Sequence, residues 1–310
     1  MLTYTAQRAV SALLLMLLIS VVAFFLIFAS GDPAVKIAGE AGSAADAARI
    51  RQALGFDRPI YLQYLSWLSH VLQGDLGRSI YFNQPVSTII ADRVGATLTL
   101  SLSAMLLAVI LALPLGIAAA RWQDGVVDKL VLVFAAVGQA MPSFWFALLL
   151  IITLSVNWQV LPTSGSETWV HFVMPAVALA YYALPTMLRL TRAGMIETLE
   201  ADYIRTSRAT GIPPRLILFK YALRNAVVPV VGVAAAQFGS MLAGSIVIES
   251  IFALNGVGRL AFESIQRSDL PTVQALVLCF SLVYIVLTFL ADLLNAWIDP
   301  RMRSIYGNPA

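Results

Sequence analysis

Residues suited to nucleophilic or acid–base chemistry are few in this chain, and the sequence does not bring them together. Its two histidines, His70 and His171, both fall in connections between apolar stretches, and no serine elbow accompanies either one. The single cysteine, Cys279, lies inside an apolar stretch, so neither an intrachain disulfide nor a cysteine metal site is expected. We therefore expect no catalytic centre, no metal site and no cofactor on this chain.

The sequence also lacks a nucleotide-hydrolysing site. A phosphate-binding loop needs a Gly-Lys pair followed by Ser or Thr, because backbone amides and the lysine hold the phosphates together. The three lysines, Lys36, Lys129 and Lys220, follow a valine, an aspartate and a phenylalanine instead. If ATP drives this protein, then the ATP and its magnesium ion must bind to partner subunits.

Composition places the chain in a membrane. Of its 310 residues, 59% are apolar and 12% are charged, and the mean hydropathy is +0.82, whereas an ordinary soluble domain is about 25% charged. The net charge of +3 is too small to indicate nucleic acid. Six apolar windows approach or exceed the roughly 20 residues that a helix needs to cross a bilayer. They cover residues 9–30, 96–120, 130–156, 173–191, 230–252 and 274–298.

These windows contain almost no ionisable residue. Ion-coupled carriers commonly place carboxylates or histidines inside the membrane, where an ionisable group is costly and is therefore usually functional. The two acidic residues here, Glu249 and Asp292, lie toward the ends of their windows and are interpreted as interfacial groups. A self-contained ion-coupled carrier is disfavoured. We expect an all-α polytopic membrane protein with six transmembrane helices.

The basic residues set the expected orientation. With the N-terminus inside, twelve of the 20 Lys and Arg residues lie in cytoplasmic segments and eight lie outside. Six of those eight fall between Lys36 and Arg93, in a segment too long for the positive-inside rule to apply strongly. Counted over short connections alone, the ratio is twelve to two. Both termini should be cytoplasmic, with the first window retained as an uncleaved helix.

The first region of the chain, residues 1–95, is expected to hold one spanning helix and a long external segment. Pro33 prevents the first helix from simply continuing, and apolar residues then recur at helical spacing around residues 50–54 and 60–68. Residues 74–77, Gly-Asp-Leu-Gly, are typical of a turn. We predict short amphipathic helices on the outer surface, followed by a core transmembrane domain over residues 96–298 and a cytoplasmic tail over residues 299–310.

One internal connection, residues 192–228, holds most of the expected cytoplasmic charge. Asp202 is suited to cap a helix that Gly211 then ends. Pro213 and Pro214 suit the first turn of a second helix, in which Leu216, Phe219 and Leu223 would share one face. A helix, a sharp turn and another helix on the cytoplasmic surface are suited to docking a soluble partner.

This connection resembles the cytoplasmic motif of ABC importer permeases, which is named for Glu-Ala-Ala followed by a glycine. Here Arg-Thr-Ser at residues 205–207 precedes Gly211, without the acidic residue. Residues 202–211, with the Ala-Leu-Arg-Asn-Ala at 222–226 and Pro229, are instead similar to the dipeptide, oligopeptide and nickel permease branch. By this resemblance the coupling helix for the ATPase would be formed by Asp202, Tyr203, Arg205, Thr206, Arg208, Ala209 and Gly211.

The resemblance extends over nearly the whole chain and is to the first permease of such systems. Matching stretches begin at Gly31, Leu54 and Gly74 in the external segment, and at Gly244 and Gly256 near the C-terminus. It implies a type I ABC importer permease in the bacterial inner membrane, with a second permease, two ATPase subunits and an external binding protein as partners. The substrate would be a dipeptide, an oligopeptide, glutathione, a nickel chelate, an opine or an oligosaccharide, with peptides favoured. A secondary carrier or channel, and a membrane enzyme or scaffold, are the alternatives.

Overall fold

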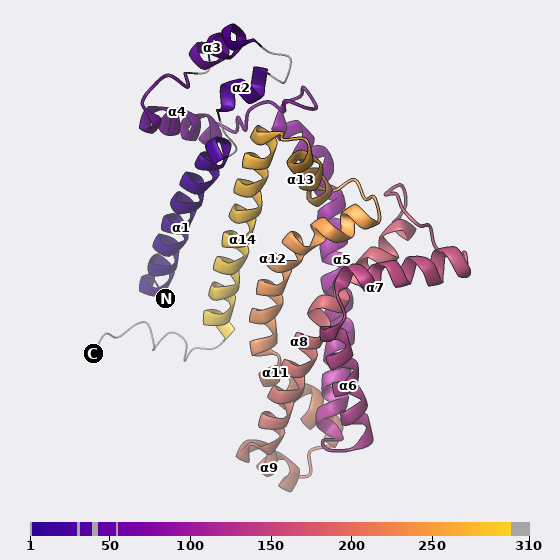
Figure 1. Ribbon diagram of the computed structural model, residues 1–310. Coiled ribbons are helices and arrows are strands. Elements are labelled where there is room, and N and C mark those ends of the chain that lie inside the picture. Colours follow the sequence, from indigo (N-terminus) through magenta and orange to yellow (C-terminus); the bar gives the residue numbers. More distant parts are fainter. Residues whose placement is uncertain (1, 30–31, 39–42, 54, 299–310) are drawn as a thin grey trace.

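The computed structural model describes residues 2–29, 32–38, 43–53 and 55–298. Gly31, Leu54 and the predicted tail at 299–310 lie outside the described residues. The described part of the chain is almost entirely helical, and its one β-bridge joins Arg78 to Pro85. Figure 1 shows long helices gathered into a bundle, with short helices at both ends.

Four helical segments are long and apolar enough to cross a membrane. They belong to α1 (Leu2–Ala29), α5 (Val86–Arg121), η2 (Trp169–Phe172) continued by α8 (Val173–Glu200), and α14 (Leu270–Ile298). Two bent helix pairs raise the number to six if each pair counts as one span. The expected all-α fold with six apolar windows is therefore confirmed, although α5 begins at Val86 rather than near residue 96.

The third predicted span is not one straight helix. The chain forms α6 (Val126–Ala140), breaks at Met141 and Pro142, and resumes as α7 (Ser143–Leu150), which the π-helix η1 (Ile151–Asn157) continues. The two halves meet at 102°, and Figure 1 shows α7 leaving the bundle sideways. Proline cannot donate a backbone hydrogen bond and clashes with the preceding turn, which explains a break at Pro142. The predicted window of 130–156 is therefore a bent pair of helices, which together are long and apolar enough for one span.

The second bent pair leads into the fifth window. It joins α10 (Pro214–Leu216), the π-helix η3 (Ile217–Ala222) and α11 (Leu223–Ala226) to α12 (Val228–Ile251), with a bend of 51°. A short helix, α13 (Val257–Gln266), then separates α12 from α14.

The main core lies between α5, α8 and α12. Helices α5 and α8 make the most extensive contact in the bundle. Fully buried alanines recur on α5 at Ala104, Ala108 and Ala112, one turn apart, so the two backbones approach closely. At Gly116 the approach is closest, since a Cβ there would lie 2.7 Å from Cβ of Thr191 on α8. These helices form the rigid centre of the molecule.

The segment between α1 and α5 is helical, as predicted. It contains α2 (Pro33–Ala38), α3 (Ala44–Ala53) and α4 (Ile60–Leu72). Hydrogen bonds from the Arg51 guanidinium and the Ala34 amide lower the pKa of the Asp32 carboxyl and tie α3 to the start of α2. The predicted turn at 74–77 is also present, with Gly74 and Gly77 both at positive φ.

This segment is anchored on the bundle by one buried carboxylate. Asp269, between α13 and α14, accepts hydrogen bonds from Ser79 Oγ at 2.5 Å and from the Ile80 amide at 3.0 Å. At the opposite end of the bundle, Arg8 of α1 pairs with Asp292 of α14 at 3.2 Å. Asp292 thus lies near the end of its helix, as predicted. We refer below to the α4 end and the α9 end of the molecule.

Candidate functional site

The candidate site at the α9 end begins at Asp202, the first of the predicted site residues. Helix α8 continues through Arg192 to Glu200, and the chain leaves helical geometry only at Ala201, which has extended dihedral angles (φ −63°, ψ 147°). Helix α9 (Asp202–Ala209) follows at once. Within the predicted connection of 192–228, residues 192–200 therefore continue α8 beyond the apolar window.

Asp202 does not cap α9 as predicted. Ala201 occupies the N-cap position, no side chain caps the helix, and Asp202 is its first helical residue. The Asp202 carboxylate instead pairs with Arg205 at 3.4 Å, and both side chains are highly exposed. Its negative charge still lies in the first turn of α9, where it interacts favourably with the helix dipole.

The end of α9 agrees with the prediction for Gly211, which has φ +77°. The Gly211 amide donates to the Arg208 carbonyl at 3.1 Å, and the Ile212 amide donates to the Ser207 carbonyl at 3.2 Å. These two bonds form a Schellman motif, which satisfies the last carbonyls of a helix and needs a left-handed residue. A Cβ on Gly211 would meet no atom within 4 Å, so only the backbone conformation restricts this position.

Three contacts hold α9 against the rest of the molecule. Ile204 is fully buried. Asn225 of α11 donates to the Tyr203 hydroxyl at 2.8 Å, and Arg208 donates to the Leu199 carbonyl of α8 at 3.3 Å. An eight-residue helix with one buried side chain would not be stable alone. Its position therefore depends on α8 and α11, and a force on α9 would be transmitted to both.

The second helix of this site begins at Pro213 and Pro214, as expected. Of the three apolar residues predicted to share one face, Leu216 and Phe219 are exposed and Leu223 is half-buried. The residues that pack on the bundle are Ile217, Leu218 and Ala222, which lie in the π-helical stretch η3. This arrangement leaves two large apolar side chains exposed on the second helix.

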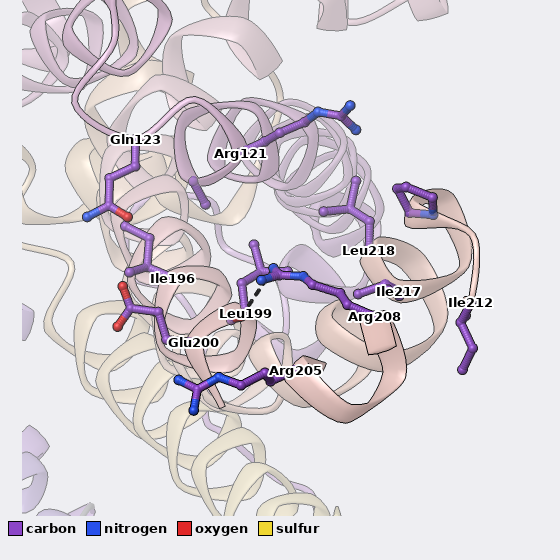
Figure 2. A pocket seen from close by; sticks show the side chains of 12 residues that line it. Arg121, Gln123, Ile196, Leu199, Glu200, Arg205, Arg208, Ile212, Ile217 and Leu218 are labelled. Carbon is purple, nitrogen blue, oxygen red and sulfur yellow. Dashed lines mark hydrogen bonds between the residues drawn. The ribbon is translucent and has the colours of Figure 1, made fainter. Parts of the chain in front are cut away.

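A pocket of about 880 Å³ lies behind α9. Figure 2 shows it between the end of α5, the end of α8 and the α9–η3 region, with the Arg208 side chain crossing its centre. Apolar side chains from α8 and η3 line much of the wall, and Arg121, Glu200 and Arg205 supply charge. Of the predicted site residues, Arg205 and Arg208 line this pocket, while Asp202, Tyr203, Thr206, Ala209 and Gly211 are exposed.

An ion pair with a buried carboxylate and a half-buried guanidinium lies near this site and was not predicted. Arg192 of α8 donates two hydrogen bonds to the Asp128 carboxylate of α6, at 2.6 and 2.7 Å. Asp128 is 2% exposed and also accepts the Asp124 amide at 2.9 Å. In the sequence, Asp128 and Arg192 are 64 positions apart and each looks like an ordinary helix-end charge, so only the fold reveals the pair.

Glu249 is fully buried, so its interpretation as an interfacial group was wrong. One carboxylate oxygen accepts the Thr97 hydroxyl of α5 at 2.8 Å, and the other accepts the Arg259 amide in the first turn of α13 at 2.9 Å. The Thr97 oxygen also accepts the Val257 amide at 2.8 Å. The carboxylate therefore caps α13 and joins it to α5 and α12. The sequence held one signal for this contact: two glycines, Gly256 and Gly258, follow Glu249 and would let a backbone approach its carboxylate closely.

Among the residues that the structure describes, no cluster of three or more His, Cys, Asp or Glu side chains is arranged for a metal ion. His171 pairs with Glu167 at 3.0 Å and completes a capping box with Thr168 ahead of α8, and His70 contacts the Ser66 carbonyl at 2.7 Å. Both histidines are thus engaged in local structure.

Comparison with known proteins identifies a family for nearly the whole chain. Residues 112–304 match the family described as binding-protein-dependent transport system inner membrane component, and residues 1–102 match its N-terminal companion. The chain is 39% identical over 304 residues to the glutathione transport system permease protein GsiC of Salmonella typhimurium, covering 98% of this chain and 99% of that protein. The GsiC protein of Escherichia coli strain K12 is 38% identical over the same length.

Solved structures show the same fold. A chain of the MetNI methionine ABC transporter, in an inward-facing conformation, superposes with a TM-score of 0.57 at 19% identity, covering 68% of this chain and 96% of that chain. A chain of an amino acid ABC transporter crystallised with histidines gives a TM-score of 0.52 at 16% identity, covering 69% and 94%.

Proposed function

This chain belongs to the family of binding-protein-dependent transport system inner membrane components and is a permease subunit of an ABC importer, and we propose that it imports short peptides of the glutathione class. Family membership removes the alternatives of a secondary carrier and of a membrane enzyme. The peptide class is supported by the similarity of the whole chain to glutathione permeases. In this proposal the chain forms the translocation path with a second permease, in the bacterial inner membrane.

The energy source in this proposal is ATP hydrolysis on two partner subunits, which also bind the magnesium ion. The absence of a Gly-Lys-Ser/Thr sequence supports this assignment, since the chain itself cannot hold a nucleotide phosphate in that way. A soluble binding protein would deliver the substrate to the α4 end, which we place outside the cell. The α9 end, and both termini, would then be cytoplasmic.

The coupling element in this proposal is α9 with the turn at Gly211. This assignment rests on one observation: α9 has an exposed surface but is held in a fixed position. Tyr203 and Arg205 are exposed, while Ile204 is fully buried against the bundle. Closure of the ATPase dimer would press on α9 and, through the Arg208 and Tyr203 contacts, move α8 and α11. Such a push shifts the bundle between two states only if the ATPase contacts α9 differently in each state.

A cross-linking experiment tests the coupling assignment. In a Cys279→Ser background, Arg205→Cys should form a short bismaleimide cross-link with a cysteine placed on the ATPase surface, and the yield should change when ATP binds. Arg49→Cys on α3 is the matched control, because its side chain is equally exposed but lies at the α4 end. No cross-link from any α9 position, in a complex that transports normally, would refute the role of α9.

Uptake measurements test the substrate class. Vesicles that contain the assembled transporter and its binding protein should accumulate radiolabelled glutathione in the presence of internal ATP, and unlabelled short peptides should compete. Nickel chelates, opines and oligosaccharides should not compete. Accumulation of one of these solutes without any glutathione uptake would reject the peptide proposal while leaving the importer assignment intact.

A further inference from the structure

We propose that α4 is an interfacial membrane helix, whose apolar face lies in the outer layer of the same bilayer that α1 crosses. This proposal does not depend on the substrate or on the coupling role of α9. It concerns only the thirteen-residue helix Ile60–Leu72, which contains no Asp, Glu, Lys or Arg.

The residues of α4 divide sharply around the helix axis. At ~100° per residue, apolar side chains fill a continuous arc of roughly 160°. The opposite side holds Gln63, Ser66, Ser69 and His70, with Leu62 as the exception. A helix with a broad apolar face and a polar face is suited to lie flat at the boundary between water and lipid. The apolar arc is formed by Trp67, Ile60, Val71, Tyr64, Leu68, Tyr61, Leu72 and Leu65.

Only one edge of this apolar arc packs against protein. Tyr64 and Trp67 contact Phe24 of α1, with ring centroids 5.5 and 5.6 Å away, and the Tyr64 hydroxyl lies 2.8 Å from Ser20 Oγ. No residue of α4 is buried, and the other edge remains open: Tyr61 is 63% exposed, Leu65 56% and Leu72 79%. Three large side chains facing water from one short helix would be unfavourable by about 25 cal/mol for each Å² of apolar surface.

The contact with α1 fixes the depth of α4. The apolar stretch of α1 runs from Thr5 to Leu26, so the contact residues Ser20 and Phe24 lie about 9 and 3 Å before its end, at 1.5 Å per residue. Figure 1 shows α4 lying across this end of α1. An interfacial helix buries its apolar face about 5 to 10 Å into the boundary between headgroups and acyl chains. The depth at which α4 meets α1 is therefore the depth that such a helix occupies.

The surface beside α4 identifies lipid as the occupant. Val22 and Phe25 of α1 are 54% and 47% exposed and belong to a span that faces the acyl chains. Because α4 packs against Ser20 and Phe24 of this same span, its open edge lies at the level of the membrane. The uncharged polar side of α4 suits the headgroup layer, and tyrosine and tryptophan are enriched at that level of a membrane.

Spin labels at adjacent positions test this proposal. In the Cys279→Ser background, Leu65→Cys and Ser66→Cys place labels on the apolar and the polar side of the same turn. The full-length chain is reconstituted with its partner subunits in vesicles of phosphatidylethanolamine and phosphatidylglycerol. We expect the label at 65 to collide more often with lipid-soluble oxygen and less often with a water-soluble nickel complex. The ratio of the two rates should exceed that at 66 several-fold.

Reference positions on the same chain calibrate the measurement. A label at Leu18, which is 60% exposed on α1, reports a lipid-facing site, and one at Arg49 on α3 reports a water-facing site. Equal nickel accessibility at 65 and 66 would mean that α4 stands in water, and would overturn the proposal. Shielding of residue 65 from both reagents would mean that a protein partner covers this face, and would overturn it as well.

Discussion

Gly211 is the residue at which the coupling proposal can be tested most directly. Its φ of +77° is readily adopted by glycine, whereas a β-branched residue there is strained by roughly 1 to 3 kcal/mol. Since nothing lies within 4 Å of a Cβ at this position, Gly211→Val introduces backbone strain without a steric clash. We expect normal insertion but a several-fold loss of uptake by the assembled transporter, together with loss of ATPase stimulation by the loaded binding protein.

Gly95→Val is the matched control for this substitution. Gly95 is also exposed and also has no atom within 4 Å of a Cβ, but it lies inside α5 with ordinary helical φ. Its replacement should leave uptake and ATP hydrolysis nearly unchanged. If Gly211→Val supported wild-type uptake with stimulated ATP hydrolysis, the turn would not be needed for coupling. Circular dichroism and membrane yield of both variants separate a coupling defect from misfolding.

The buried Glu249 carboxylate gives a second prediction at the residue scale. A Cβ on Gly256 would lie 2.2 Å from Glu249 Oε2 and 2.7 Å from Thr97 Oγ1, closer than atoms can approach. Gly256→Ala should therefore displace the network that caps α13 and lower the free energy of unfolding by about 1 to 3 kcal/mol. The midpoint of thermal unfolding in detergent should fall by several degrees. Gly74→Ala, at an exposed turn with open space but positive φ, should cost about 1 kcal/mol and so separates the clash from backbone strain.

At the scale of elements, the Asp128–Arg192 pair joins α6 to α8 just before the chain enters α9. Removal of one partner of a fully buried ion pair leaves an uncompensated charge and costs about 3 to 5 kcal/mol, whereas apolar replacement of both is often tolerated. The Arg192 side chain is 21% exposed, so we expect Asp128→Ala to cost less than this, on the order of 1 to 3 kcal/mol. The double variant Asp128→Ala, Arg192→Met should recover part of the loss. Chemical unfolding of the four proteins of this cycle measures the coupling energy.

The same cycle distinguishes a stabilising pair from a dispensable one. A pair that faced solvent would contribute about 0 to 1 kcal/mol, and the two single variants would then behave additively. Additive effects of Asp128→Ala and Arg192→Met would show that the buried geometry does not matter for stability. As a control, Asp202→Ala removes the exposed partner of Arg205 and should change the unfolding free energy very little.

Helices and their ends were predictable from the sequence wherever a single local pattern determines them. Apolar windows identified the long helices, and Gly211 and the two prolines after it identified the turn that ends α9. Proline alone does not indicate where a helix breaks, because it is tolerated inside α5 and α8, at Pro114 and Pro185, where the helix continues. Local sequence could not separate these cases, since the difference lies in how neighbouring helices pack.

The side-chain network was less predictable than the elements. Asp128 and Arg192, like Glu249 and Thr97, are joined only after helices distant in the chain have packed. Which side of the helix after Pro214 is buried depends on how it packs on the bundle: Ile217 and Leu218 are buried, whereas Phe219 is exposed. Periodicity therefore predicted which segments are helical, but not which side chain each helix presents to its neighbours.

At the scale of the whole molecule, the distribution of charge predicts orientation. Basic residues near the ends of spanning helices favour the cytoplasmic side, and short connections carry most of this preference. The α9 end contains Arg121, Arg205 and Arg208 around one pocket, whereas the α4 end is the long segment to which the rule applies weakly. The α9 end should therefore be cytoplasmic, with the α4 end outside.

Cysteine labelling in intact cells tests this orientation. In the Cys279→Ser background, Ala45→Cys on α3 and Arg205→Cys on α9 both place a thiol at an exposed position, so neither requires the protein to open. A membrane-impermeant maleimide should label residue 45 in intact cells and should label residue 205 only after the membrane is permeabilised. The permeabilised sample controls for intrinsic reactivity, and a negatively charged maleimide should react readily beside Arg208. Labelling of residue 205 but not of residue 45 in intact cells would invert the topology. The ATPase would then have no access to α9, and the coupling role of this helix would fail together with the orientation.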